Sequence, residues 1–301
     1  MSNNSICQET SRLLYLCGYS IIAVLGLVLN IVALYLFFHL PKLRSPTTVY
    51  MKNLAFADLL LVCTLPLRIY GYTLPPTATP SSTMRTLICD VAGSLLLLNM
   101  YGSIFLLTCI SLDRYLAVCF PIRSRHLRQK APWVCVGVWT LNLGSCIASY
   151  TSTKESNSSS CFYGQPPFVT KKGPTIGALT VGFLVPVLII TASSVVLLRA
   201  VGHSHVVQEG MVNKLKILHM LTANICIFLL CFLPYHTVLL LYQVLTHSCT
   251  IDEAYKITLL TACCNTVLDP FAYYFASETM KNMVRVEIKV GKMRLIELSD
   301  L

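Results

Sequence analysis

Seven long apolar runs divide this 301-residue chain and restrict what it can fold into. Each run is near or above the ~20 residues that an α-helix needs to cross a bilayer. Only 12% of residues are charged, whereas a soluble domain has about 25%. The sequence therefore predicts an all-α membrane protein, a bundle of seven transmembrane helices. The runs occupy residues 13–38, 48–72, 88–118, 131–150, 174–201, 213–245 and 252–276.

A single domain with two flanking segments accounts for the whole chain. Residues 1–12 form a polar N-terminal segment without the features of a cleavable signal peptide, and residues 13–276 form the bundle. Residues 277–301 alternate apolar and basic positions. This pattern predicts a short amphipathic helix along the inner membrane surface.

The basic residues are distributed unevenly between the two sides of the predicted bundle. Sixteen of the 23 lysines and arginines fall in alternate loops and the C-terminal segment, and seven fall on the other side. Cytoplasmic loops carry the excess of basic residues, so we expect a multi-pass plasma-membrane protein with its N-terminus outside and its C-terminus in the cytoplasm. Anionic inner-leaflet lipid explains the net charge of +10 better than nucleic acid does. Two glycosylation acceptors, Asn3 and Asn157, fall on the expected outer side.

Most of the 14 cysteines lie inside the apolar runs, where a thiol acts as a small apolar filler. Four have an expected oxidising location: Cys7, Cys89, Cys161 and Cys249. Four cysteines allow three pairings, and the residues alone leave these open. No Cys or His pair has the spacing of a metal site.

Each apolar run contains a short polar or proline motif at a characteristic depth. The motifs are Gly26–Asn30, Asn53–Asp58, Asp113-Arg114-Tyr115, Trp139, Pro186, Cys231–Tyr235 with Pro234, and Asp269-Pro270-Phe-Ala-Tyr273. Taken in order, they resemble the rhodopsin-like G-protein-coupled receptors over about residues 10–285. The resemblance implies a seven-transmembrane receptor that activates heterotrimeric G proteins, with Gi and Rho-activating classes expected. It also implies a Cys89–Cys161 disulfide, which leaves Cys7 to pair with Cys249.

Asp58 is a carboxylate near mid-membrane, where a charged group needs a partner or an ion. The resemblance places Asn30, Asn99, Ser103, Asn265 and Asp269 around it. This cluster could hold a sodium ion, and no other cofactor is expected. The alternative is a polar network that packs the helices without an ion.

Asp113 and Arg114 form an acid–base pair at the cytoplasmic end of the third run. The resemblance implies that Asp113 holds Arg114 at rest, and that Arg114 with Tyr115 later meets a G protein. The alternative is a surface ion pair worth at most about 1 kcal/mol. Pro234 and Pro270 each remove a helix hydrogen bond and are expected to allow kinks. Asp269 and Tyr273 complete this predicted switch.

Two runs, Thr64–Tyr70 and Asn99–Ile104, together with Asp269-Pro270, are similar to the purinergic-related branch, and most similar to the non-Edg lysophosphatidic acid receptors. Arg68 aligns with an arginine that faces the ligand phosphate there, so an anionic ligand is expected. Thr246 and Asp252 replace further arginines of that group. The other ligand-binding candidates are Tyr101, His236, Lys256, Arg85, Lys171 and Lys172. Lysophosphatidylinositol, kynurenate-like acids and nucleotides remain alternatives to lysophosphatidic acid.

Other classes of protein fit the sequence less well. A retinal pigment needs a lysine where Cys263 stands, and a transporter would show internal repeats. The seven histidines form no recognisable catalytic pair with a serine or cysteine, so no enzyme is expected. A non-signalling scavenger or scaffold receptor is the main alternative class, and the intact Asp113-Arg114-Tyr115 motif argues against it.

Overall fold

The computed structural model describes residues 3–39, 45–73, 91–154, 172–203, 211–245 and 249–276. Within these ranges, the description of side chains leaves out residues 3–11, 149–154, 201, 203, 211–216, 249, 275 and 276. All regular structure in the described ranges is helical. The elements are α1 (Asn3–His39), α2 (Pro46–Thr73), α4 (Ala92–Cys119), α5 (Arg125–Arg128), α6 (Ala131–Lys154), α8 (Lys172–Leu179), η2 (Thr180–Leu184), α9 (Val185–His203), α11 (Met211–Ile227), η3 (Phe228–Phe232), α12 (Leu233–Val244), α13 (Cys249–Cys263) and α14 (Asn265–Ala276).

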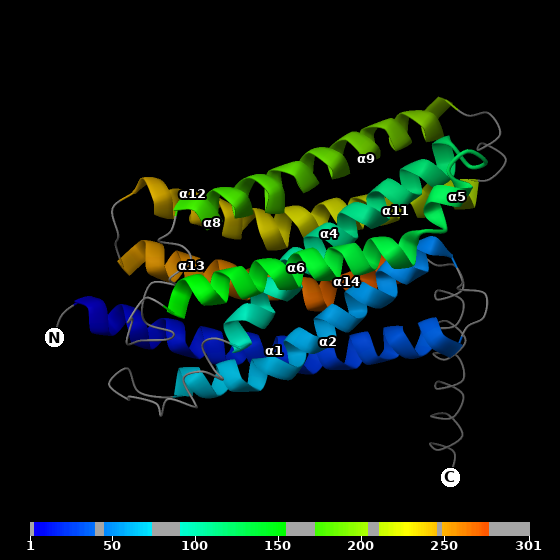
Figure 1. The fold of residues 1–301 in the computed structure, drawn as a ribbon. Coiled ribbons are helices and arrows are strands. Elements are labelled where there is room, and N and C mark those ends of the chain that lie inside the picture. Colours follow the sequence, from blue (N-terminus) through cyan, green and yellow to red (C-terminus); the bar gives the residue numbers. More distant parts are fainter. Residues whose placement is uncertain are drawn as a thin grey trace, which may run out of the picture.

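The long helices run side by side along one direction (Figure 1). The start of α1 and the start of α13 lie at one end of the bundle, which we call the N-terminal end, and α5 lies at the opposite end (Figure 1). α4 is central, with contacts to α2, α6 and α9. The elements follow the seven apolar runs, and the expected all-α bundle of seven helices is confirmed.

Six of these spans are single stretches of helix that are long and apolar enough to cross a membrane, within the described residues. The seventh run instead forms two helices, because α13 ends at Cys263 and α14 begins at Asn265. The backbone N–H of Cys264 donates to the carbonyl of Thr261 (3.1 Å), which tightens the turn between the two. The two pieces, of 15 and 12 residues, are each shorter than the ~20 residues of a full span. Only the two helices together, one after the other, are long enough to form the seventh span of the membrane.

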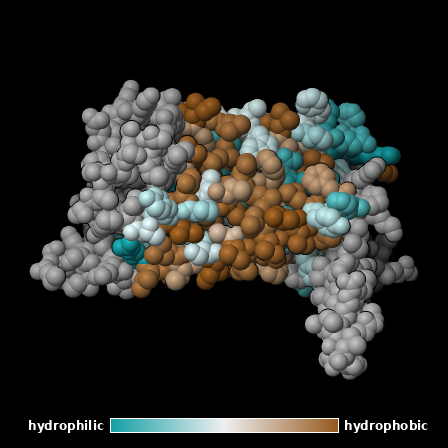
Figure 2. Space-filling view, turned by 90° about the horizontal axis from the view of Figure 1, so that it is seen from below, coloured by the Kyte–Doolittle hydropathy of each residue, from teal (hydrophilic) through white to brown (hydrophobic). Residues whose placement is uncertain are grey.

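The described surface is apolar around its middle. A brown belt of hydrophobic residues covers the centre of the face in Figure 2, and hydrophilic residues gather towards its ends. Exposed apolar side chains such as Ile21, Val24 and Leu188 contribute to this outer surface. Apolar area of this extent in contact with water would be unfavourable, so the belt indicates contact with lipid.

Between the α-helices that the structure describes, two π-helical segments, η2 and η3, interrupt a span, and a proline follows each of them. η2 comes before Pro186 and η3 before Pro234. In each segment the carbonyl of the first residue accepts from the N–H five positions on, at Val185 and at Leu233 respectively. A proline removes one α-helical hydrogen bond, and a π turn is one way to accommodate that loss. The distortion expected at Pro234 therefore takes the form of a π turn on its N-terminal side.

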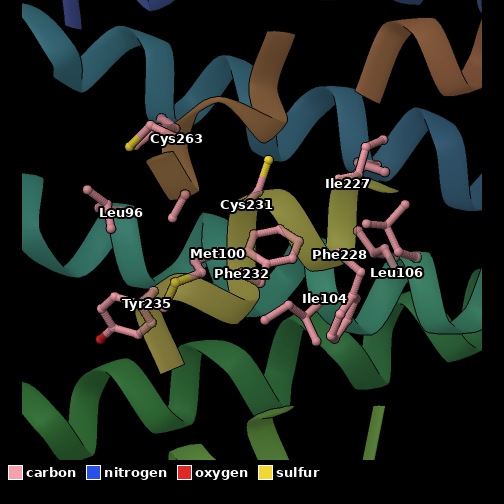
Figure 3. Close-up of a cluster of buried hydrophobic side chains, with 14 of the residues drawn as sticks. Leu96, Met100, Ile104, Leu106, Ile227, Phe228, Cys231, Phe232, Tyr235 and Cys263 are labelled. Carbon is pink, nitrogen blue, oxygen red and sulfur yellow. The ribbon is translucent and has the colours of Figure 1, made fainter. Parts of the chain in front are cut away.

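The second π segment directs its aromatic side chains towards the centre of the bundle. Phe228 and Phe232 lie near Met100, Ile104 and Leu106 of α4 (Figure 3). All of these side chains are buried. Core packing at η3 therefore joins the sixth span to the central helix.

Candidate functional site

The polar residues expected around Asp58 do come together in the centre of the bundle. Asn99 of α4 donates its side-chain N–H to Asp58 Oδ1 of α2 (2.9 Å). Asn265 of α14 donates to Ser103 Oγ (2.9 Å) and to Asp269 Oδ2 (3.4 Å). All five side chains are buried. Three helices therefore contribute to one polar cluster with no access to solvent.

Asn30 brings α1 into the same region because a glycine allows the helices to approach. The side-chain N–H group of Asn30 donates to the carbonyls of Gly26 (2.9 Å) and Thr266 (2.8 Å). A Cβ added at Gly26 would lie 2.9 Å from Val62 of α2 and 3.0 Å from Thr266 of α14. The glycine in the Gly26–Asn30 motif thus permits a close approach of three helices.

Three buried oxygens in this cluster accept no hydrogen bond from the described residues: Asp58 Oδ2, Asp269 Oδ1 and Asn30 Oδ1. Asp58 and Asp269 are also close enough to interact electrostatically. Buried acceptors without donors are costly, and carboxylate and amide oxygens are the ligands that hard cations prefer. These three oxygens are suitable ligands for a cation such as sodium.

Arg68 lies at the N-terminal end of the bundle and is only 6% exposed. Its guanidinium carbon lies 5.8 Å from the centre of the Tyr19 ring, a cation–π contact. Tyr72 and Tyr255 are also its electrostatic neighbours. Arg68 therefore points into the bundle among tyrosines of three spans, as expected of an arginine that does not face lipid.

Lys256 has a carboxylate partner that sequence reasoning missed. Its Nζ lies 2.8 Å from Glu253 Oε1, and the hydroxyl of Tyr15 donates to Glu253 Oε2 (2.9 Å). Glu253 therefore already offsets the positive charge of Lys256. The spacing of Glu253 and Lys256, three residues apart on a helix, was the available signal.

His236 and Tyr101 lie within an aromatic cluster. The His236 ring stacks on Phe183 with centroids 4.1 Å apart and meets the edge of Tyr101 at 5.8 Å. Tyr235 connects this cluster to Tyr255, with their ring centroids 5.7 Å apart. Aromatic contacts therefore join His236 and Tyr101 to the tyrosines beside Arg68.

A cavity of about 360 Å³ lies between α4, α6, α8 and η2. Tyr101 forms part of its wall with Phe105, Asn142 and Cys146. Arg68, Lys256 and His236 are not among its lining residues.

The remaining ligand-binding candidates are Arg85, Lys171 and Lys172. Lys172 is exposed at the start of α8. Arg85 and Lys171 lie outside the described residues, as does Thr246. Asp252 accepts a hydrogen bond from the hydroxyl of Tyr242.

At the opposite end of the bundle, Asp113 is paired with a residue that the sequence did not suggest. Arg128 of α5 reaches Asp113 with its Nε (2.7 Å to Oδ1) and its Nη2 (3.3 Å to Oδ2). The hydroxyl of Thr47 donates to the same carboxylate. Arg114 forms no ion pair within the described part of the chain, and its Nε is buried without a hydrogen bond. The expected Asp113–Arg114 contact is thus replaced by Asp113–Arg128.

The remaining switch residues lie along the spans as their motifs suggested. Tyr115 meets the edge of Phe120, with ring centroids 5.8 Å apart. Tyr273 is buried beside Phe37. Pro270 is inside α14 and Pro234 is in the first turn of α12.

Several predicted sites lie outside the described residues or side chains. For the disulfides these are Cys7, Cys89, Cys161 and Cys249, and for glycosylation Asn3 and Asn157. The amphipathic segment 277–301 is also outside them. Both disulfides, both glycosylation sites and this helix stay predictions.

A seven-helix bundle with a central polar cluster and an acid–base motif at one end defines a class of membrane receptor. The sequence profile of the 7 transmembrane receptor (rhodopsin family) matches residues 29–273, and the chain belongs to that family of G-protein-coupled receptors. It is therefore a receptor that activates G proteins and not an enzyme, and the family resides in the plasma membrane as multi-pass proteins.

Individual relatives narrow the branch. The chain is 37% identical to lysophosphatidic acid receptor 6 of Homo sapiens over 292 residues, which cover 91% of this chain and 83% of the relative. It is 38% identical to lysophosphatidic acid receptor 4 of Homo sapiens over 299 residues, 93% of this chain and 79% of that one. G-protein coupled receptor 68 of Homo sapiens is 35% identical over 271 residues, 87% and 73% of the two chains. The similarity to lysophosphatidic acid receptors expected from the sequence is confirmed.

Proposed function

We propose that this receptor responds to an anionic lysophospholipid, with lysophosphatidic acid as the first candidate, and activates Gi and Rho-activating G proteins. The observation that supports this most directly is the burial of Arg68 among tyrosines at the N-terminal end of the bundle. A buried guanidinium is costly to desolvate, and its planar donors match a phosphate. The relatives named as lysophosphatidic acid receptors point to the same class of ligand.

The proposal includes an orientation in the membrane. The N-terminal end of the bundle faces outward, where a ligand arrives, and the end with Asp113 and Arg114 faces the cytoplasm and the G protein. The excess of lysine and arginine in alternate loops supports this orientation. It also gives Cys89–Cys161 and Cys7–Cys249 an oxidising location, and Asn3 and Asn157 access to glycosylation.

The ligand proposal is tested by a panel of anionic lipids in cells that express the receptor with an epitope tag before Met1. We expect lysophosphatidic acid to stimulate G-protein activation. Arg68→Ala and Lys256→Ala should each raise the half-maximal concentration by about ten- to a hundredfold, since one charge-assisted bond contributes about 1.5–3 kcal/mol.

Two controls accompany this experiment. Arg68→Lys keeps the charge but loses the fork of donors, so its loss should be intermediate. Staining of the tag on intact cells measures surface expression and also tests the outward N-terminus. A potent uncharged agonist that is insensitive to both alanine substitutions would contradict the anion proposal.

We also infer that the central cluster holds a sodium ion in the resting receptor. The three buried oxygens without donors, on Asp58, Asp269 and Asn30, support this site. An ion there would join α1, α2 and α14, and the effect of sodium on the agonist response tests it.

A further inference from the structure

Glu253 is a largely buried carboxylate in the first part of α13, and both of its oxygens have partners. Lys256 Nζ lies 2.8 Å from Oε1, and the Tyr15 hydroxyl lies 2.9 Å from Oε2. The side chains of Lys256 and Glu253 are only 13% and 12% exposed. This ion pair is therefore far less screened by water than a pair on a helix surface.

The pair is connected to Arg68 through stacked tyrosines. Tyr15, which donates to Glu253, stacks on Tyr72 with ring centroids 5.0 Å apart. Tyr72 stacks on Tyr19 at 5.9 Å, and Tyr19 lies against the Arg68 guanidinium. Arg68, Glu253 and Lys256 thus belong to one network at the N-terminal end of the bundle.

The net charge of these three side chains affects which headgroup charge they can bind. Arg68 and Lys256 contribute two positive charges and Glu253 one negative charge, so the three side chains together carry one positive charge. A headgroup with one negative charge neutralises them. A second negative charge on the headgroup would meet the Glu253 carboxylate, and like charges brought together at a binding site reduce affinity.

A purely structural role for Glu253 is the simpler alternative. An acid three residues before a lysine stabilises a helix through their ion pair, and the Tyr15 bond ties α1 to α13. This role alone predicts that removing the charge weakens the response to all ligands equally. It gives no reason for a difference between headgroups.

We propose that Glu253 is a specificity-determining residue that makes the receptor respond less to a headgroup with two negative charges than to a headgroup with one. This inference rests on the proposed function, and it deepens it by naming how the charge of the headgroup affects the response. A phosphodiester carries one charge, whereas a phosphate monoester carries about 1.5 to 2 at neutral pH. Glu253 therefore lowers the response to a monoester in its dianionic form more than the response to a phosphodiester.

The experiment compares lysophosphatidic acid, a monoester, with lysophosphatidylinositol, a phosphodiester, on the full-length receptor in cells. Glu253→Gln removes the charge but keeps a side chain of the same length that can still contact Tyr15 and Lys256. We expect it to lower the half-maximal concentration of the monoester about tenfold. The value for the phosphodiester should change by less than about threefold.

Two further variants separate charge from structure. Lys256→Gln leaves Arg68 and Glu253, with no net charge, and should shift the ratio of the two potencies against the monoester even if Glu253→Gln does not reach the cell surface. Tyr15→Phe removes the bond to Glu253 without changing any charge, and the ratio should stay at its wild-type value.

The possible outcomes distinguish this inference from the proposed function. Equal shifts for both lipids in Glu253→Gln, or an unchanged ratio in Lys256→Gln, would overturn the role of Glu253 while the receptor still responds to anionic lipids. A wild-type receptor that ignores both lipids would overturn the proposed function and this inference with it. A monoester-selective gain in Glu253→Gln supports the inference.

Discussion

The buried carboxylate of Asp113 pairs with Arg128 of α5, and this pair leaves Arg114 without Asp113 as its ion-pair partner. Its oxygens accept from Arg128 and Thr47, and the Asp113 side chain is only 3% exposed. Arg114 is adjacent in sequence but has no part in this pair. With Asp113 engaged by α5, Arg114 makes no ion pair with Asp113 that a G protein would have to break.

Arg128→Ala should therefore weaken signalling, because Asp113 would lose its partner and could form an ion pair with Arg114 instead. We expect agonist-stimulated nucleotide exchange to fall by roughly fivefold, a coupling of about 1 kcal/mol between contacting residues. Adding Asp113→Asn to Arg128→Ala should restore much of the exchange, because Arg114 then has no carboxylate to bind. Arg125→Ala, an exposed arginine on the same short helix, serves as the control and should match wild type. Equal exchange rates in Arg128→Ala and wild type would show that α5 has no such role.

At the scale of elements, the sequence predicted the positions of the spans but not their internal geometry. Apolar length predicts a membrane helix because the bilayer has a fixed thickness. Pro186 and Pro234 indicate that a helix hydrogen bond is missing, but packing determines whether the helix kinks or forms a π turn. The break at Cys264 could not be predicted in this way, because no proline or glycine stands there. Likewise, the motif positions of Asp58 and Asn99 predicted their contact, whereas the Asp113–Arg128 pair depends on the short helix α5, which apolar runs do not reveal.

The π segment η2 brings the backbone of the fifth span close to α4, and two glycines test this approach. A Cβ added at Gly182 would lie 2.6 Å from Tyr101 Cε1, whereas one added at Gly177 would meet no atom of the described residues within 4 Å. Gly182→Ala must displace a ring that packs against His236, and we expect a loss of about 1–3 kcal/mol. Gly177→Ala should be neutral or stabilising by up to about 1 kcal/mol, because alanine favours a helix. Thermal unfolding of the purified receptor measures both. A Gly182→Ala midpoint at or above that of Gly177→Ala would contradict the close packing.

At the scale of the whole molecule, three charged groups follow one another along the bundle. The first is Arg68 with Glu253 and Lys256, the second is Asp58 with Asp269, and the third is Asp113 with Arg128. The start of α13, which carries Glu253 and Lys256, and α5, which carries Arg128, lie at opposite ends of the bundle (Figure 1). The sequence placed the central group well, because its motifs fall on four different spans at the same depth. It described the N-terminal group only in part, since the pairing of Lys256 with Glu253 changes the net charge of that group. Residue types alone do not determine such a net charge, because it depends on which side chains share a buried space.

This arrangement predicts that an ion in the centre opposes the agonist at the N-terminal end. A cation held by oxygens of Asp58, Asp269 and Asn30 would stabilise the resting packing of α1, α2 and α14. An agonist that favours another packing must then bind more weakly when sodium is present, and the effect is reciprocal. Replacing about 150 mM sodium, the physiological ionic strength, by an organic cation should strengthen agonist binding by roughly fivefold or more.

Asp58→Asn should abolish this dependence on sodium, because one of the two carboxylates that attract the ion is lost. Competition binding in membranes measures agonist affinity at each salt composition, and potassium in place of sodium tests the specificity for the ion. Asn142→Ala provides a matched control, since Asn142 is a buried amide on α6 that bonds to the Leu98 carbonyl (2.7 Å) outside the cluster. This variant should keep the wild-type response to sodium. If Asp58→Asn also keeps it, the carboxylates only pack the helices, and the coupling between the two ends of the bundle does not pass through an ion.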